Sequence, residues 1–222
     1  MPELYIITGS NGAGKSTIGS NYLPLSIQEK CPVFDGDKLF MEKQRELWKN
    51  GITAHKEAKK IAYSFVEETF NSLVESAISG KNDFVYEGHF TNEATWDIPK
   101  KFKANQYKIN MIFFGLTDIS LSESRVIKRT KVGGHYVNPE TIASNFYGNL
   151  EKLNKHFILF DILAIIDTSE SEHRLLCFFE NGESTFSIAS KHLPHWFQYN
   201  LPKLLGKVIE YELNKTSNNE KL

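Results

Sequence analysis

The chain has 222 residues, which fits one domain or one domain with a small appendage. A hydrophobic share of 41%, a charged share of 24% and a formal net charge of −1 are ordinary for a globular protein, and they argue against recruitment to nucleic acid or acidic membranes by overall charge. The two cysteines are far apart, and no apolar run nears the ~18 residues of a membrane span, so we expect no disulfide framework, zinc site or membrane contact. We expect a cytoplasmic protein without a signal peptide.

Short runs rich in Val, Ile, Phe and Tyr recur along the chain and indicate strands. They cover residues 4–8, 31–35, 83–87, 109–115 and 162–167. Several of these runs are apolar at consecutive positions, which is typical of strands that are covered on both faces. We therefore expect a doubly wound, mostly parallel sheet of five strands.

Helical periodicity fills the intervals between these runs. The expected helices cover residues 54–79, 94–104, 118–131 and 139–156. Asp118 is a suitable N-cap for the third helix, and Pro139 suits the first turn of the fourth. Alternation of strands and helices, with a glycine-rich turn after the first strand, predicts an α/β fold of the P-loop NTPase and kinase type.

The pattern changes after the fifth strand. Residues 175–189 read as a β-hairpin that turns at Asn181-Gly182, and we prefer a sheet extension covered by the aromatic Trp196. We assign residues 1–206 to one kinase-like domain and residues 207–222 to a polar C-terminal tail.

The glycine-rich turn fits the pattern G-x-x-x-x-G-K-[ST] without a gap. Its nucleotide-binding residues are Gly9, Ser10, Asn11, Gly12, Ala13, Gly14, Lys15, Ser16 and Thr17. Backbone N–H groups of such a turn surround phosphates, and the following helix presents its positive end to them. We expect ATP here, with Lys15 on the β- and γ-phosphates and Ser16 as a ligand of Mg²⁺.

Two acids end the second strand, in Asp35-Gly36-Asp37. This strand end should lie across the sheet from the phosphate turn, where Asp37 can accept the proton of an acceptor hydroxyl while Asp35 supports it. The alternative is that Asp37 only caps the helix that starts at Lys38.

Arg125 and Arg129 are spaced four apart and precede Gly133-Gly134-His135. The spacing puts both arginines on one helix face, and such an element can act as a lid that brings guanidinium groups to the transferring phosphate. The alternative is a solvated basic face.

Together these motifs resemble the zeta toxin family of P-loop kinases, from residue 3 to about residue 167. The resemblance rests on the phosphate turn, the Asp-Gly-Asp strand end, the stretch YEGHFT (86–91) and above all the stretch RVIKRTKVGGHYV (125–137). It implies ATP-dependent phosphorylation of a small molecule, which in characterised toxins is the sugar 3′-hydroxyl of UDP-N-acetylglucosamine. It also implies an antitoxin partner that blocks the ATP site.

Carried over by position, the resemblance makes Asp37 the general base and Glu87 an acid of the acceptor pocket. Arg125 or Arg129 matches the first arginine on the ATP phosphates, and His135 lies near the position of a second. His89 and Thr91 complete the expected acceptor contacts. His89 stands where a small hydroxyl residue is frequent, which puts the sugar nucleotide in question.

One stretch departs from the family pattern. Many relatives carry two arginines in R-[FY]-x-R-[SN]-L after Gly-Gly-His, whereas this chain has Asn145 and Gly148 at those places. Such arginines can contribute ~10³-fold to phosphoryl transfer. Three functions therefore stay open: a small-molecule kinase, an ATP-binding regulatory protein with little transfer, and a P-loop ATPase.

Overall fold

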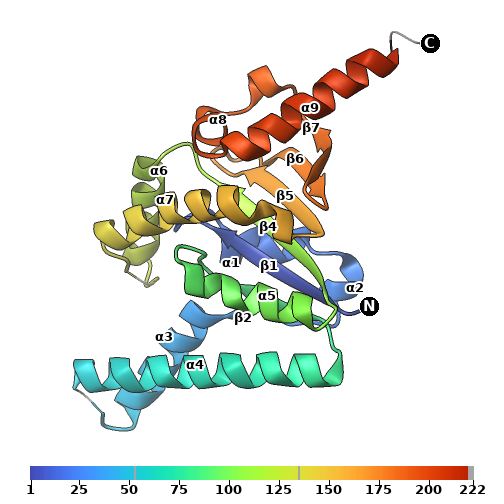
Figure 1. The fold of residues 1–222 in the computed structure, drawn as a ribbon. Helices are drawn as coiled ribbons and strands as arrows, with labels where there is room; N and C mark the ends of the chain where they lie inside the picture. Colours follow the sequence, from blue (N-terminus) through green and yellow to red (C-terminus); the bar gives the residue numbers. More distant parts are fainter. Residues whose placement is uncertain (53, 135, 220–222) are drawn as a thin grey trace.

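A seven-stranded sheet forms the centre of the computed structural model, which describes residues 1–52, 54–134 and 136–219 (Figure 1). Its strands follow the order β2-β3-β1-β4-β5-β6-β7. They are β1 (Glu3–Gly9), β2 (Phe34–Asp35), β3 (Phe84–Glu87), β4 (Lys108–Gly115), β5 (Ile162–Asp167), β6 (Arg174–Glu180) and β7 (Glu183–Ser187). The first five pair in parallel and the last two add antiparallel pairs, which confirms the predicted α/β P-loop kinase fold.

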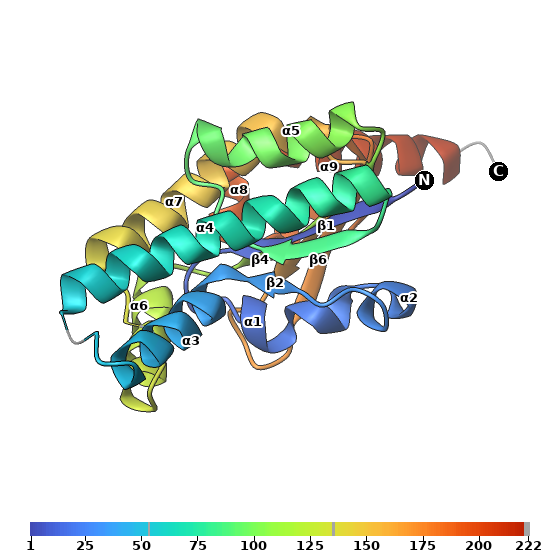
Figure 2. The same cartoon turned by 90° about the horizontal axis from the view of Figure 1, so that it is seen from below.

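Helices cover both faces of the sheet. They are α1 (Lys15–Ile18), α2 (Leu25–Gln28), α3 (Gly36–Lys49), α4 (His55–Gly80), α5 (Asp97–Ala104), α6 (Ile119–Lys131), α7 (Pro139–His156), α8 (His195–Asn200) and α9 (Pro202–Asn219). Short 3₁₀ turns are η1 (Gly19–Tyr22), η2 (Glu93–Trp96), η3 (Phe157–Leu159) and η4 (Ser190–His192). Figure 2 shows α1 and α2 on one face of the sheet and α5, α7 and α9 on the other.

The second strand is shorter than the sequence predicts. Only Phe34 and Asp35 of the expected run 31–35 pair with β3. Pro32 has no N–H to donate to a strand ladder, so the chain joins the sheet only two residues later. The other four parallel strands lie within one residue of their expected bounds at each end.

The hairpin continues the same sheet, as expected. Asn181 and Gly182 have φ values of 51° and 82°, which a two-residue turn between antiparallel strands requires. Trp196 of α8 is 2% exposed and lies on the backbone of Gly115, where a Cβ atom would overlap its ring. The indole therefore covers the sheet next to the hairpin.

The boundary that we expected at residues 206/207 falls inside α9. Leu201, Leu204 and Val208 recur at helical spacing and are fully buried. The apolar stripe therefore fixes the helix to the domain, and the polar residues after position 206 form its exposed face.

The helices α3 and α4 form an arm with a small core of its own. Phe40, Leu47, Ala58 and Ala62 are buried together there, apart from the main core. Both views place α3, the start of α4, α6 and the start of α7 beyond the carboxyl ends of the parallel strands (Figures 1 and 2). Ligands of open α/β sheets bind at this edge. Among the described helices, none has the length and apolar character needed to cross a membrane.

Replacing Trp196 with alanine is expected to lower the free energy of unfolding by about 3–5 kcal/mol, because a large buried ring leaves a cavity over Gly115. Urea unfolding followed by circular dichroism measures this. Tyr199→Ala on the same helix is the control, because Tyr199 is 76% exposed and its loss should change stability by less than about 0.5 kcal/mol. Equal changes in the free energy of unfolding for the two substitutions would contradict the assignment of Trp196 as a buried cover over Gly115.

Candidate active site

The phosphate turn links the end of β1 to the start of α1. Gly12 and Gly14 have φ values of 73° and 88°, a region that favours glycine. At Gly12 a Cβ atom would also lie 2.9 Å from Cβ of Arg125, so α6 packs directly on the turn. Thr168 supports the turn from the end of β5, since its hydroxyl donates to the carbonyl of Ala13 at 3.0 Å.

Lys15 is held inside this turn. Its ammonium donates to the carbonyls of Gly9 and Ser10, both at 3.0 Å, and the residue is 7% exposed. Burial lowers the pKa of Lys15, while the negative charges of Glu87 and Asp37 act in the opposite direction. A cation in this position is available to an anion that enters the turn.

Strand register brings two acids, Glu87 and Asp35, to the edge of the sheet where the phosphate turn lies. Glu87 pairs with Ile7 of β1 on one side and with Asp35 of β2 on the other. Ser16 Oγ donates to Glu87 Oε1 at 2.9 Å, and burial raises the pKa of Glu87 while Lys15 opposes the shift. The Ser16 hydroxyl and the Glu87 carboxylate are hard oxygen ligands, the kind that Mg²⁺ takes together with phosphate oxygens.

Asp35, and not Asp37, caps the helix that follows. The Lys38 N–H donates to Asp35 Oδ1 at 3.0 Å, and α3 begins at Gly36. The alternative that Asp37 merely caps the helix is therefore wrong. Asp37 lies in the exposed first turn of α3, and its charge acts on the pKa of both Lys15 and Glu87.

The two arginines of α6 face the phosphate turn. Arg125 donates to the carbonyl of Gly12 at 3.3 Å and to that of Ser169 at 2.8 Å. The charge of Arg129 lowers the pKa of Lys15, and its side chain packs against Gly134. Arg125 is therefore not part of a solvated face. His135 lies outside the described residues.

A network of amides and one imidazole joins α7 to the phosphate turn. Asn149 is 1% exposed; its Oδ1 accepts from the Phe90 N–H at 2.6 Å, and its Nδ2 lies 3.2 Å from His89 Nδ1. Asn145 Nδ2 donates to Asn11 Oδ1 at 2.8 Å. We did not predict Asn145 and Asn149 as site residues, although two asparagines four apart on an otherwise apolar helix face were the available signal.

The imidazole of His89 stays neutral in this network. Loss of solvent lowers the pKa of His89 well below its usual value, and the positive charge of Lys15 adds to the shift. Both ring nitrogens face side-chain amides: Nδ1 lies 3.2 Å from Asn149 Nδ2, and Nε2 lies 3.5 Å from Asn11 Nδ2.

Thr91 lies against α7. At Gly148 a Cβ atom would be 3.0 Å from Cβ of Thr91, so the helix backbone approaches the 88–91 turn closely. A long side chain at position 148 would have to displace that turn. This close approach is the local reason why the position is occupied by glycine.

A hollow of about 380 Å³ opens beside Glu87 and His89, between α4 and residues 86–98. Its lining is Phe34, Tyr63, Val66, Glu67, Phe70, Tyr86, Glu87, Gly88, His89, Phe90, Thr95 and Ile98. We call it the acceptor pocket. A larger hollow of about 710 Å³ lies between residues 30–39, α4 and β3, and its lining includes neither Glu87 nor His89.

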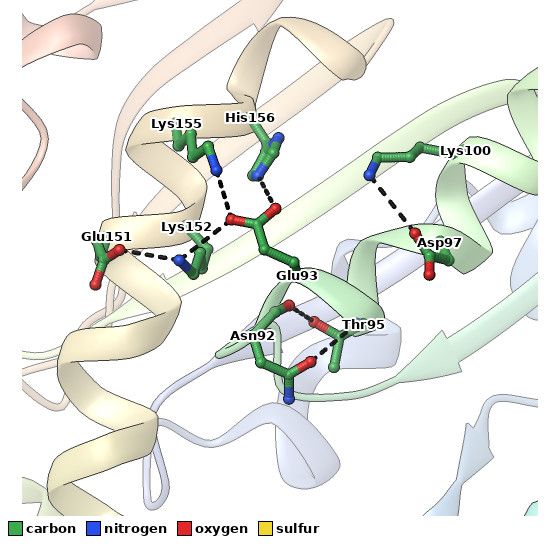
Figure 3. Close-up of polar contacts among 9 residues, drawn as sticks. All are labelled: Asn92, Glu93, Thr95, Asp97, Lys100, Glu151, Lys152, Lys155 and His156. Atoms are coloured by element: carbon green, nitrogen blue, oxygen red, sulfur yellow. Dashed lines mark hydrogen bonds and ion pairs between the residues drawn. The ribbon is translucent and has the colours of Figure 1, made fainter.

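An ion-pair cluster fixes residues 92–96 to α7, at one end of the segment 88–96 that follows β3 and that we call the acceptor segment (Figure 3). Glu93 accepts from Lys155 at 2.5 Å and pairs with Lys152 at 3.3 Å and His156 at 3.0 Å. Hydrogen bonds from these groups, that of Lys155 above all, lower the pKa of Glu93 to about 2. The ring of His156 also stacks on Trp96, with centroids 4.6 Å apart.

His89 should make stability depend on pH. In the unfolded chain the imidazole binds a proton below about pH 6.5, whereas the folded form resists it, so the free energy of unfolding falls as the pH drops. Between pH 7.5 and 5.5 this loss should be about 1 kcal/mol greater in the native chain than in His89→Gln. Urea titrations measure it, with His192→Gln, an exposed histidine, as control. Parallel curves for native chain and His89→Gln would contradict the burial of a neutral ring.

The geometry agrees with the comparisons to known proteins. The chain resembles a structure from the PezAT chromosomal toxin-antitoxin system of Streptococcus pneumoniae, at 18% identity and a TM-score of 0.57, over 99% of this chain and 87% of that chain. It also resembles a chain of the AvrRxo1-ORF1:-ORF2 structure with ATP, at 16% identity and a TM-score of 0.66, over 83% of this chain and only 60% of that chain.

At these identities the likeness shows the fold. A search of curated protein sequences gives no match. The sequence model of the zeta toxin family, however, matches residues 1–176, which is most of the chain. The chain therefore belongs to the zeta toxin family.

Proposed function

We propose that this chain is an ATP-dependent phosphotransferase that moves the γ-phosphoryl group of ATP to a hydroxyl of a small molecule. The observation that carries the proposal is the convergence of three strand ends. Glu87 pairs in register with Asp35 on one side and Ile7 on the other, and it accepts a hydrogen bond from Ser16 of the phosphate turn. A nucleotide site and a carboxylate-rich pocket thus share one edge.

ATP would occupy the turn of residues 9–17, whose N–H groups and helix end favour phosphate oxygens. The ammonium of Lys15 leaves the carbonyls of Gly9 and Ser10 for the β- and γ-phosphates. Ser16 and Glu87 would hold Mg²⁺, which supplies charge neutralisation to the phosphates. Arg125 and Arg129 provide further positive charge from α6.

The transfer itself is a displacement at phosphorus. The acceptor oxygen forms a bond to the γ-phosphorus while the bond to the β–γ bridging oxygen breaks, and ADP leaves with that electron pair. Asp37 takes the proton of the acceptor hydroxyl. Glu87, His89 and Thr91 belong to the acceptor side, Thr91 through its packing on α7, and a nucleotide sugar is the acceptor that the family resemblance implies.

A protein partner is part of the proposal. One of the similar structures comes from a toxin-antitoxin system, and another is a complex of two open reading frame products. We infer that an antitoxin-like protein covers the ATP site of this chain.

A second function has one observation in its favour. Asn145 and Gly148 stand where the family pattern has arginines. In this chain Asn145 donates a hydrogen bond to Asn11 of the phosphate turn, and Gly148 packs against Thr91 of the 88–91 turn. An ATP-binding protein with little transfer would follow if Lys15 and the arginines of α6 leave the transition state short of positive charge.

Asp37→Asn is expected to lower phosphoryl transfer by about 10²–10⁴-fold, because the acceptor proton loses its base, while the Kd for ATP stays within about twofold. Labelled ATP and a panel of hydroxyl compounds, read by mass spectrometry, measure transfer. Asp97→Asn is the matched control, since its side chain is 74% exposed on α5. Unchanged transfer in Asp37→Asn would refute Asp37 as the base. ATP binding without transfer to any acceptor would favour the second function.

Lys15→Ala should weaken ATP binding by about 10–100-fold, because charge-assisted hydrogen bonds contribute about 1.5–3 kcal/mol. Isothermal titration calorimetry measures the Kd. Lys128→Ala removes an exposed lysine from α6 and should leave the Kd unchanged. An equal weakening of ATP binding in both variants would mean that ATP responds to the overall positive charge of this region and not to Lys15 itself.

A further inference from the structure

The acceptor pocket reaches the phosphate turn at its inner end. Two of its lining residues also contact that turn: Glu87 accepts from Ser16 Oγ at 2.9 Å, and His89 Nε2 lies 3.5 Å from Asn11 Nδ2. A molecule in the pocket can therefore present a hydroxyl to the γ-phosphate. The chemistry of the pocket wall should then select the molecule.

Aromatic rings form much of this wall. Phe70 lies 5.1 Å from Phe34 and 5.3 Å from Tyr86, measured between ring centroids, and Tyr86 lies 6.1 Å from Phe90. The ring of Tyr63, on the exposed side of α4, completes the lining. Rings that hold each other in place offer faces and edges to another planar ring.

The charges of the wall are of one sign. Glu67 and Glu87 line the pocket, and its described lining contains no lysine or arginine.

Lys59 of α4 lies over the ring of Tyr63, 5.7 Å from its centroid. Other lysines on the neighbouring elements have anionic partners. Lys152 and Lys155 of α7 pair with Glu93, and Lys100 of α5 pairs with Asp97 (Figure 3). Lys15 and the arginines of α6 face the phosphate turn, where the phosphates of ATP would take them. A phosphate group placed in the pocket away from the phosphate turn would meet Glu67 and no lysine or arginine of the described lining.

We propose that the acceptor is a hydroxyl compound with a planar ring and no negative charge, of the nucleoside class, and not a phosphorylated compound such as a nucleotide sugar. This rests on the proposed function. The ring lies among Phe34, Phe70, Tyr86 and Phe90, an amine or N–H of the ring donates to Glu67, and the sugar hydroxyl points to the γ-phosphate.

Matched pairs of compounds test the proposal. Adenosine is compared with AMP, and uridine with UMP and with UDP-N-acetylglucosamine, in the presence of a non-hydrolysable ATP analogue and Mg²⁺. Calorimetry gives the Kd of each, and mass spectrometry with ATP gives transfer. At least one nucleoside is expected to bind about 10-fold more tightly than its phosphorylated counterparts.

Two neighbouring substitutions isolate the charge of the wall. Glu67→Lys should reduce the preference for the nucleoside at least about fivefold. Glu68→Lys makes the same charge change on the next residue of α4, which lines a different hollow with Lys43 and Lys60, and should leave the preference unchanged. Both glutamates are exposed, so both variants should fold.

The outcomes separate this inference from the proposed function. Tighter binding of phosphorylated compounds, or no nucleoside that binds better than its phosphate, overturns the nucleoside class, and Asp37-dependent transfer to a phosphorylated acceptor would then keep the kinase. Nucleosides that bind as expected but accept no phosphoryl group from ATP would support the pocket chemistry and refute the kinase. An equal effect of Glu67→Lys and Glu68→Lys would remove Glu67 from the pocket's selectivity.

Discussion

Parallel pairing of β3 with both of its neighbours is the constraint on which the site depends. The register that sets Glu87 beside Ile7 and Asp35 fixes three chain segments, from distant parts of the sequence, at one edge of the sheet. The phosphate turn follows β1, the helix with Asp37 follows β2, and the acceptor segment follows β3. A shift of one residue in the pairing of β3 with β1 would turn Glu87 to the other face of the sheet and break its bond to Ser16, and the same shift of β2 would turn Asp35 away.

Helix α7 connects the two sides of the site. Asn145 contacts the phosphate turn, Asn149 holds the backbone of Phe90, and the last turn carries the lysines that bind Glu93. The helix therefore sets the distance between the phosphate turn and the acceptor segment. Asn145 and Gly148, where the family pattern has arginines, contribute fixed geometry instead, so in the proposed kinase charge neutralisation would fall to Lys15 and the arginines of α6.

Much of the fold could be predicted because its signals are local. The apolar runs, the Asn-Gly turn, the cap at Asp118 and Pro139 in the first turn of α7 each act within a few residues, and the structure contains them. The shortened β2 and the helical C-terminus depend on pairing and burial against distant segments, which local patterns do not contain. The same holds for the site: the phosphate turn is a contiguous motif, whereas the contacts of Asn149 join residues 60 positions apart. Asp35 is the N-cap of α3, although Asp37 two positions later is a residue type that also suits a cap.

The separate small core of the α3–α4 arm has an evolutionary consequence. Phe40, Leu47, Ala58 and Ala62 form a core of their own in the first part of α4, and the exposed Tyr63 and Glu67 of that helix line the acceptor pocket. Phe70, further along α4, packs on the main core instead. Substitutions at Tyr63 and Glu67 can therefore change the wall of the pocket while the sheet, the phosphate turn and α6 keep their packing. Within one fold, the nucleotide side can be inherited unchanged while the acceptor side diversifies.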